Sequence, residues 1–378
     1  SASAAQVFYR KWRPSSFSQL VGQEHVSSTL RQSLKQGRVA HSYLFCGPRG
    51  SGKTTTARII AKAVNCLDPQ DGDPCNACEP CQTINSGQYM DIIELDAASN
   101  RGIDEIRDIR EKVNFAPAQG QRKVYIIDEA HMLTEAASNA FLKTLEEPPE
   151  HVKFVFATTE IRKVPVTVLS RCQRFDLRRV DMETLAAHFA AIAEKEGAKI
   201  SQSALHLITR AADGSVRDGL SLLDQAVSHT ATEGDGEIDE AEVRGMLGLA
   251  DRSRSFMLLE SVMAGDVAPA LDLLGQLYKE GADPLAILED LLEITHWLTR
   301  IKVVAAAADA PDVPEIERVR GKDLESRLSM AALARTWQML LKGLQEVRQA
   351  PSPIQAAEMI LVRLAHTAEL PTPEEAIR

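Results

Sequence analysis

The stretch Gly47-Pro48-Arg49-Gly50-Ser51-Gly52-Lys53-Thr54 decides the fold of the chain. It fits the pattern G-x-x-x-x-G-K-[ST], a loop whose backbone N–H groups surround the phosphates of a nucleotide. The glycines allow a tight curl, because a Cβ would obstruct both the turn and the approach of a phosphate. We expect Lys53 to reach the β- and γ-phosphates and the hydroxyl of Thr54 to bind Mg²⁺. These eight residues and Thr55 are the predicted phosphate-binding residues.

The residues around this loop support the same interpretation. Residues 42–46 form an apolar run that predicts a buried strand entering the loop. Residues 55–64 predict a helix that leaves the loop, with its N-terminus directed at the bound anion. The alternative is a chance match to the motif, which this strand–loop–helix order disfavours. The sequence therefore predicts a nucleotide-binding site.

Length and charge limit the remaining possibilities. With 378 residues we expect two or three domains. The sequence has no apolar run long enough to span a bilayer and no secretory signal, so we expect a soluble, cytoplasmic protein. The net charge of −10 divides unevenly, with +4 on residues 1–180 and −14 on the remainder. This asymmetry favours an N-terminal module that meets polyanions and a C-terminal module that does not.

Both ends of the chain carry a sequence signal. Residues 1–6 lack an initiator Met, which is typical of a trimmed or tagged start. Pro371 and Pro373 suggest that residues 371–378 begin a linker. We therefore expect the native protein to continue into a C-terminal tail.

Four cysteines form a C-x8-C-x2-C-x2-C pattern in a segment rich in Pro, Asp, Gly and Asn. They are Cys66, Cys75, Cys78 and Cys81. Such closely spaced thiolates can converge on one tetrahedral Zn²⁺, and four cysteine ligands leave no open position for catalysis. Disulfides and redox chemistry are the alternatives, and the expected intracellular location disfavours the first. The sequence predicts a structural zinc module over residues 66–81, with Cys46 and Cys172 as packing residues.

Two of the strands expected after the loop, at 123–129 and 152–157, are predicted to complete a nucleotide site. The run at 91–96 is followed by a helix with isoleucines on one face, and the run at 123–129 ends in two carboxylates. Asp128 is expected to complete the Mg²⁺ site, and Glu129 to orient and deprotonate the attacking water. The strand at 152–157 ends in Thr158 and Thr159, whose hydroxyl groups we expect beside the γ-phosphate.

The repeated strand–helix order predicts an α/β fold. After a helix at 138–147, which stops before Pro148, and the strand at 152–157, a further strand is expected at 173–177. Such a mostly parallel sheet has its binding site at the carboxyl ends of the strands.

An apolar and basic segment precedes the loop and is expected to form the wall of the base pocket. It contains the candidate nucleotide-binding residues Arg10, Arg13, Pro14 and Val21. Trp12 and Phe17 are either part of this wall or ordinary core residues. The helical spacing at 26–36 predicts a helix that ends at Gly37.

Together these motifs resemble an AAA+ clamp-loader ATPase. The resemblance rests on residues 10–14, 21–24, the phosphate loop, residues 128–131 and the Ser-Arg-Cys triplet at 170–172. The four-cysteine insertion and Leu-Glu-Glu-Pro-Pro-Glu at 145–150 make the chain similar to the bacterial DNA polymerase III gamma/tau subunits, over essentially all its residues. The implied fold is an AAA+ P-loop ATPase core with an inserted zinc module, a small helical lid and an all-helical collar.

The resemblance assigns roles to two arginines. Arg171 corresponds to an arginine finger that reaches the ATP of a neighbouring subunit, and Arg217 to a sensor arginine that touches the γ-phosphate in cis. From the residues alone, a surface ion-pair partner is the favoured interpretation of Arg171. Arg217 could pair on its helix with Asp218 or Asp224.

The implied domains are the ATPase core at 1–180, the lid at 181–243 and the collar at 244–370. Amphipathic spacing predicts lid helices at 181–197, at 201–212 and from 214, then a polar linker at 232–237. The expected collar helices are at 255–263, 268–279, 284–304, 329–347 and 354–370, with a loop at 308–314.

The resemblance implies an ATP-driven motor subunit that opens a sliding clamp and loads it onto primer–template DNA within the DNA polymerase III holoenzyme. Its cofactors would be ATP, Mg²⁺ and Zn²⁺. Its partners would be delta- and delta-prime-type clamp-loader subunits in a ring, the clamp and DNA, with polymerase and helicase bound through the tail. The alternatives are a translocating helicase and a scaffold that binds ATP without hydrolysing it.

For DNA contacts the resemblance favours residues at helix N-termini facing the interior of the ring. The candidates are Ser99, Arg101, Arg107 and Lys143. Many relatives have a basic residue directly after Ala-Ala-Ser, where this chain has Asn100, so individual contacts are expected to be displaced along the chain. Simple solvation of these surface residues is the alternative.

Overall fold

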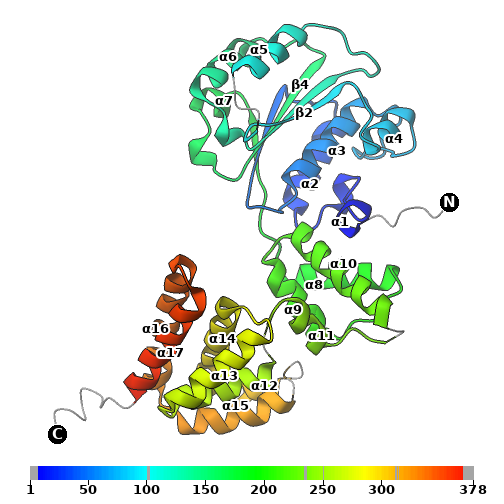
Figure 1. Cartoon of the computed structure of the whole chain (residues 1–378). Coiled ribbons are helices and arrows are strands. Elements are labelled where there is room, and N and C mark those ends of the chain that lie inside the picture. The colour runs from blue at the N-terminus through cyan, green and yellow to red at the C-terminus, as the bar shows by residue number, and fades with distance from the viewer. Residues whose placement is uncertain are drawn as a thin grey trace. The chain divides into compact units, whose positions relative to one another are not determined.

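A computed structural model of the chain contains the parallel sheet that the strand–helix order predicts (Figure 1). The structure describes residues 7–99, 103–233, 236–249, 251–310, 313 and 315–368. The chain divides into two compact units, Ser1–Lys199 with Ile208–Gly234, and Ile200–Leu207 with Asp235–Arg378. Within the described part of the chain, no helix combines the length and apolar character needed to cross a bilayer.

The sheet of the first unit has five strands in the order β2-β3-β4-β1-β5, and every neighbouring pair is parallel. The strands are β1 (Ser42–Cys46), β2 (Ile92–Asp96), β3 (Lys123–Asp128), β4 (Val152–Thr158) and β5 (Gln173–Asp176). Every residue of β4 is buried, whereas β2 and β5 at the edges are partly exposed. Central parallel strands covered on both faces are continuous apolar runs, which is why the sequence reveals them.

Helices cover both faces of the sheet (Figure 1). Successive side chains of a strand point to opposite faces, so Tyr43 and Phe45 of β1 pack with the first helix pair, and Leu44 with the second. The first pair is α2 (Glu24–Lys35) and α3 (Lys53–Asn65), and the second is α5 (Ile103–Lys112) and α6 (Glu135–Glu146). This arrangement holds the carboxyl ends of β1, β3 and β4 at one edge, where the phosphate loop lies.

Shorter elements complete the first unit. They are α1 (Phe8–Lys11), α4 (Glu79–Asn85), α7 (Val166–Leu169), and the 3₁₀ helices η1 (Phe17–Gln19), η2 (Ala130–Met132) and η3 (Ile161–Lys163). The lid helices are α8 (Met182–Lys195), α9 (Gln202–Ala212) and α10 (Val216–Glu233). The boundary between the two units falls inside α9.

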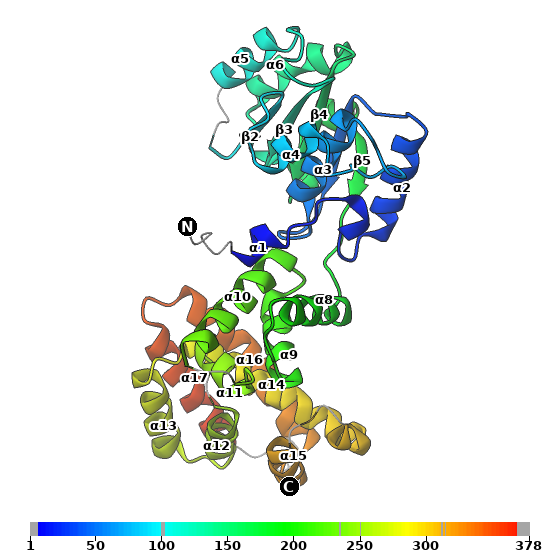
Figure 2. The same ribbon diagram turned by 90° about the vertical axis from the view of Figure 1, so that its right-hand side faces the viewer.

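The second unit is helical. Its elements are α11 (Glu240–Met246), α12 (Arg252–Met263), α13 (Val267–Lys279), α14 (Pro284–Val303), η4 (Ala305–Asp309), α15 (Glu315–Arg327), α16 (Met330–Gln349) and α17 (Pro353–Ala368). Helix α14 supplies fully buried residues to its core, among them Leu288, Leu291 and Leu298. Helices α12, α13 and α17 contact one another, as Figure 2 also shows.

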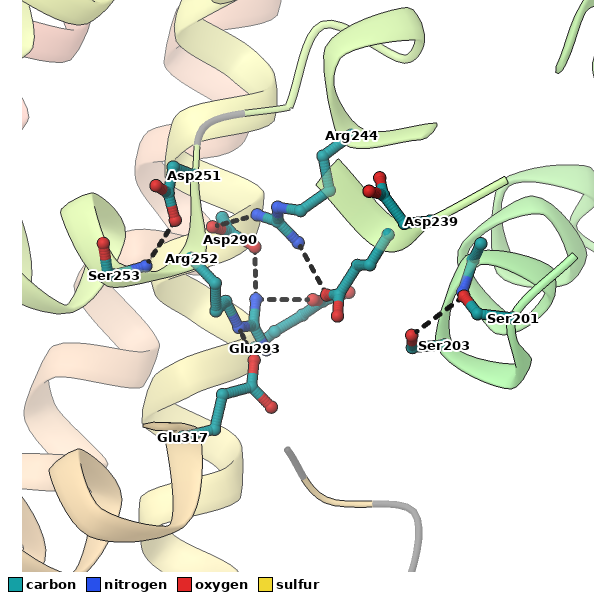
Figure 3. A network of polar contacts seen from close by, with 12 residues as sticks. Ser201, Ser203, Asp239, Arg244, Asp251, Arg252, Ser253, Asp290, Glu293 and Glu317 are labelled. Carbon is teal, nitrogen blue, oxygen red and sulfur yellow. Dashed lines mark hydrogen bonds and ion pairs between the residues drawn. The ribbon is translucent and has the colours of Figure 1, made fainter. Parts of the chain in front are cut away.

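A buried ionic network ties α11, α12, α14 and α15 together (Figure 3). Asp290 of α14 accepts from Nη2 of Arg244 at 2.8 Å and from Arg252. Arg252 also pairs with Glu317 at 2.7 Å and with Glu293 at 3.4 Å. Burial opposes the charge on Arg252, but the three carboxylates outweigh burial and raise the pKa of this guanidinium.

Several expectations about helices need correction. Helix α15 was not predicted, because its sequence is highly charged and has little helical apolar periodicity. Leu324 is one buried hydrophobic residue of this helix. The short helices α1, α4 and α11 were not predicted either. Helix α10 continues to Glu233, two residues into the expected linker. The expected loop at 308–314 begins inside η4, and residues 311, 312 and 314 lie outside the described residues.

Candidate nucleotide-binding site

The phosphate loop joins β1 to α3 and has the backbone that its glycines allow. Gly50 and Gly52 have φ angles of +75° and +101°, a region that residues with a Cβ rarely adopt. A Cβ on Gly50 would also lie 1.9 Å from Oγ of Ser215, at the start of the lid helix α10. The loop therefore requires glycine both for its own curl and for the close approach of the lid.

Lys53 begins α3 and folds back over the loop. Its Nζ donates to the carbonyl oxygens of Gly47 at 2.9 Å and Pro48 at 2.8 Å. Burial lowers the pKa of Lys53, against the opposing effect of the Asp128 and Glu129 carboxylates. A buried ammonium with two carbonyl partners at the mouth of the loop is suited to exchange those partners for phosphate oxygens.

Thr54 and Asp128 meet at the end of β3. The hydroxyl of Thr54 donates to Oδ2 of Asp128 at 3.1 Å, and the N–H of Glu129 donates to Oδ1 at 2.8 Å. A hydroxyl and a carboxylate beside a phosphate-binding loop are the oxygen ligands that Mg²⁺ uses in nucleotide sites. These two residues fit a Mg²⁺ ion.

Glu129 is linked to the tip of β4 through His131. The buried Thr158 hydroxyl accepts from the N–H of Glu160 at 3.0 Å, and it lies 2.9 Å from Nδ1 of His131. When the Thr158 hydroxyl donates its hydrogen bond to Nδ1 of His131, Nδ1 acts as the acceptor and carries no hydrogen. The hydrogen of the neutral ring is then on Nε2. Nε2 lies 3.3 Å from Oε2 of Glu129. Sequence reasoning missed His131, although it follows the two carboxylates by two residues.

The loop, the strand ends and the lid enclose a pocket of about 780 Å³, a size typical of small-molecule sites. The predicted residues that line it are Arg10, Arg13, Pro14, Val21, Arg49, Gly50, Ser51, Gly52, Lys53, Thr54, Thr55, Asp128, Glu129, Thr159 and Arg217. Gly47 and Pro48 instead face Lys53 with their carbonyl groups. Thr158 faces His131, so of the two threonines Thr159 is the one that lines the pocket.

Sequence reasoning missed part of the wall. Tyr9, Leu20, Arg58, Glu94, Leu95, Asp96, Ile126, Val216 and Leu220 also line the pocket. The apolar members among them suit the base of a nucleotide. Ser99, predicted as a DNA contact, lines the same pocket.

Cationic side chains converge on the pocket. Arg217 lies over the ring of Tyr9, with Cζ 5.1 Å from the ring centroid, and Arg10 lies 5.6 Å from the same centroid. Burial, and then the positive charges of Arg58 and Arg217, lowers the pKa of Arg13. These guanidinium groups repel one another, so an anionic ligand bound among them is favoured.

The two carboxylates proposed as alternative partners of Arg217 have other contacts. Asp218 lies 3.5 Å from Nη2 of Arg49, and Asp224 accepts from the N–H of Phe8 at 3.1 Å. Arg217 instead lies over Tyr9 and reaches the pocket.

Trp12 and Phe17 do not form the base wall. Nε1 of Trp12 donates to Glu196 at 2.9 Å, and Lys195 lies over its ring. Phe17 is fully buried in the core between the sheet and α2–α3. The alternative, that Phe17 is an ordinary core residue, is correct, and Trp12 instead ties α1 to the end of α8.

Three further predicted residues, Arg107, Lys143 and Arg171, do not line this pocket. Arg171 pairs with Glu146 at 2.9 Å. Arg107 of α5 lies 3.8 Å from Asp104, and Lys143 is exposed on α6, which packs against α5. Arg101 lies outside the described residues.

The four cysteines of the insertion come together. Their sulfur atoms all lie within 4.8 Å of one another, and the sulfurs of Cys66 and Cys78 are 3.9 Å apart. All six cysteines of the chain are free thiols. Zn–S bonds of about 2.3 Å in a tetrahedron give sulfur separations of about 3.8 Å, so these residues fit Zn²⁺.

Backbone groups support the thiolate form at Cys75, whereas burial raises the pKa of Cys66 and Cys81 in the protein without metal. The N–H groups of Ala77 and Cys78 donate to Sγ of Cys75 and lower its pKa to about 6. Outside the cluster, Cys172 packs against the sheet core, and burial raises its pKa to about 12.

Comparison with known proteins identifies the family. The family model for "DNA polymerase III, delta subunit" matches residues 22–181, and that for the "DNA polymerase III clamp loader subunit, ATPase lid domain" matches residues 184–232. The model for "DNA polymerase III subunits gamma and tau domain III" matches residues 238–378. The DNA polymerase III tau subunit of Salmonella typhimurium is 41% identical over 370 residues, which are 98% of this chain. The chain belongs to the DNA polymerase III gamma/tau family.

A second gamma/tau relative has a similar sequence identity and coverage. The tau subunit of Bacillus subtilis is 40% identical over 364 residues, or 96% of this chain. The chain spans 57% of the Salmonella protein and 64% of the Bacillus protein. Among solved structures, the Holliday junction branch migration motor RuvB of Thermotoga maritima is 19% identical, with a TM-score of 0.48 over 67% of this chain and 79% of that one. For this gamma/tau chain, the predicted AAA+ fold class is confirmed.

Proposed function

We propose that this chain is an ATP-hydrolysing motor subunit of the replicative clamp loader, which opens a sliding clamp and loads it onto primer–template DNA as part of the DNA polymerase III holoenzyme. The observation that carries the proposal is the pocket in which the phosphate loop, the paired carboxylates of β3 and the lid arginine Arg217 meet. Membership of the gamma/tau family connects this pocket to clamp loading.

Each group in the pocket has a distinct role in this proposal. The N–H groups of the loop and Lys53 bind the β- and γ-phosphates. Thr54 and Asp128 hold Mg²⁺, which neutralises charge on the phosphates when it is bound. Glu129 orients and deprotonates the attacking water, while Thr159 and Arg217 contact the γ-phosphate. The adenine base lies against the apolar wall that includes Val21 and Leu220.

The position of Arg171 supports a role in trans. It pairs with Glu146 and does not line the pocket of its own chain, so its guanidinium is available at a different surface of the unit. An arginine supplied by a neighbouring subunit stabilises the charge that develops on the γ-phosphate during transfer.

We propose the domains as an ATPase core at 1–180 with the zinc insertion at about 66–81, a lid at 181–243, a collar at 244–370 that joins the ring, and a linker from 371. The four cysteines hold a structural Zn²⁺. Ser99, Arg101, Arg107 and Lys143 remain the candidate DNA contacts. The partners are delta- and delta-prime-type subunits, the clamp and DNA, and polymerase and helicase through a tail; such a replication protein acts in the cytoplasm.

The proposal is tested by two variants in the assembled loader. Lys53→Ala should abolish ATP binding, whereas Glu129→Gln should bind ATP and lose about 10²–10⁴ of the hydrolysis rate. Glu135→Gln, an exposed glutamate at the start of α6, is the matched control. Normal hydrolysis by Glu129→Gln would show that another group is the base.

The alternatives give different results in the same assembly. A clamp loader should show ATPase activity stimulated by the clamp and by primed DNA, without strand unwinding. A helicase would unwind duplex DNA, and a scaffold would load clamps at the same rate in the Glu129→Gln variant.

A further inference from the structure

The four-cysteine segment contacts the N-terminal part of the chain through one buried carboxylate. Asp73, between Cys66 and Cys75, accepts a hydrogen bond from the N–H of Phe17 at 2.8 Å. Its other oxygen accepts from the hydroxyl of Ser18 and lies 3.4 Å from Nε of Arg31, on α2. This buried carboxylate therefore holds the Phe17 amide and the Ser18 hydroxyl in a fixed place, and Arg31 keeps the carboxylate itself in position.

A second contact lies one residue beyond Cys75. The side-chain amide of Asn76 donates to the carbonyl oxygen of Ser15 at 3.0 Å. Nζ of Lys62, on α3, donates to that same carbonyl and to Oδ1 of Asn76, both at 2.6 Å. Asn76 has a φ of +56°, so its backbone is held in a conformation that few residues adopt. The insertion and α3 thus hold Ser15 jointly.

The segment held by these contacts belongs to the nucleotide pocket. We call residues 13–21 the wall loop. Its two ends line the pocket, with Arg13 and Pro14 at the start and Leu20 and Val21 at the end. The contacts from Asp73 and Asn76 reach its middle, at residues 15–18. The cysteine segment therefore holds the wall loop from outside the pocket.

We propose that Asp73 and Asn76 are positioning residues for the nucleotide, which hold the wall loop in the shape that binds the base and sugar. This inference rests on the proposed function of the pocket. If a fraction of the molecules has a displaced wall loop, the apparent Kd rises in inverse proportion to the fraction that is competent. Both residues lie within the four-cysteine segment. The proposed metal centre therefore stabilises the nucleotide site through the wall loop.

The test compares Asp73→Ala with Asp68→Ala in the full chain. Asp68 is an exposed carboxylate of the same segment, so its removal is the same chemical change away from the wall loop. We expect Asp73→Ala to weaken binding of a fluorescent ATP analogue about three- to tenfold, and Asp68→Ala to leave it unchanged. Metal analysis should give the same zinc content for both variants.

Two further readouts separate positioning from general damage. In the assembled loader, Asp73→Ala should raise KM for ATP three- to tenfold, with kcat within about twofold of wild type. Hydrogen exchange at the Phe17 amide should accelerate, because the amide no longer donates a hydrogen bond to Asp73. Asp73→Asn keeps an oxygen for that amide and should recover part of the affinity. If Asp73→Ala does not fold, Ser18→Ala tests the same contact from the wall loop and should also raise the Kd for the ATP analogue.

Equal affinity of wild type, Asp73→Ala and Ser18→Ala, with zinc retained, would overturn the inference and leave the proposed function in place. A wild-type chain that binds no nucleotide would overturn the proposed function and this inference together. Loss of kcat without a change in affinity would also overturn it, because the defect would then lie in the chemistry and not in the wall loop.

Discussion

Replacing Asp290 with asparagine should destabilise the second unit strongly. This carboxylate is buried on α14, where it neutralises the guanidinium groups of Arg244 and Arg252 (Figure 3). Asparagine keeps the shape of the side chain and removes the charge. The perturbation therefore isolates electrostatics from packing.

The size of the expected destabilisation depends on which carboxylates remain paired with each arginine after the substitution. Arg252 still has Glu317 and Glu293 at 2.7 Å and 3.4 Å, whereas the ion pair of Arg244 with Glu240 spans 3.9 Å. Breaking a buried ion pair from one side costs about 3–5 kcal/mol. Because Arg252 remains paired, we expect the low end, about 3 kcal/mol. For a unit of this size that corresponds to a fall in Tm of about 6–12 °C.

The chain offers a selective assay for the second unit. Of its three tryptophans, Trp12 belongs to the first unit, while Trp297 and Trp337 belong to the second. In a Trp12→Phe background, fluorescence during urea or thermal unfolding therefore reports on the second unit alone, which avoids treating a two-unit chain as a single transition.

Glu346→Gln is the matched control for Asp290→Asn. Glu346 pairs with Arg363 at a largely exposed site, so its loss should cost less than about 1 kcal/mol. Equal stabilities of the Asp290→Asn and Glu346→Gln variants would refute the reasoning, because burial of the network would then contribute nothing.

Three further predictions concern the first unit. Tag-free protein should contain about one Zn²⁺ per chain, and metal analysis that finds none would contradict the assignment of the four cysteines. Arg171→Ala should leave nucleotide binding by the isolated chain intact and reduce ATPase activity in the ring, and mixing it with Lys53→Ala chains should restore part of the activity; no restoration would indicate action in cis. The Arg107→Ala, Lys143→Ala double variant should flatten the salt dependence of DNA binding by about one log–log unit per contact, and an unchanged slope would remove these residues from the DNA surface.

The sequence predicted the strands well for a physical reason. Strands β1, β3 and β4 are buried on both faces, so their sequences are continuous apolar runs with sharp ends. Helix α15 shows the opposite case. Its residues are mostly charged, and contacts with α12 and α14 fix it in place, which no periodicity in its own sequence reveals.

The residues of the candidate site also fall into two groups, those that the sequence reveals and those that only the fold brings together. The phosphate loop and the carboxylates at the end of β3 are local in sequence, and their chemistry is readable from residue type and spacing. Tyr9 and Leu220 are more than 200 residues apart and become neighbours of the loop only when the lid folds against the core of the first unit. Trp12 was misjudged because an aromatic residue near a phosphate loop suits a base wall, and its actual partner, Glu196, is distant in sequence.

Three of the groups proposed for catalysis have partners within the chain. Lys53 donates to carbonyls of its own loop, Glu129 lies beside His131, and Arg171 pairs with Glu146. The last pair is more than a third exposed on both sides, so it contributes at most about 1 kcal/mol, a factor of about five. An arginine finger on a transferring phosphoryl group is worth about 10³–10⁵ in rate. The contact with Glu146 can therefore hold Arg171 ready at the surface without competing with a neighbour's nucleotide, and Glu146→Gln should change the ATPase rate of the ring by no more than about fivefold. A larger effect would mean that Glu146 itself takes part at the subunit boundary.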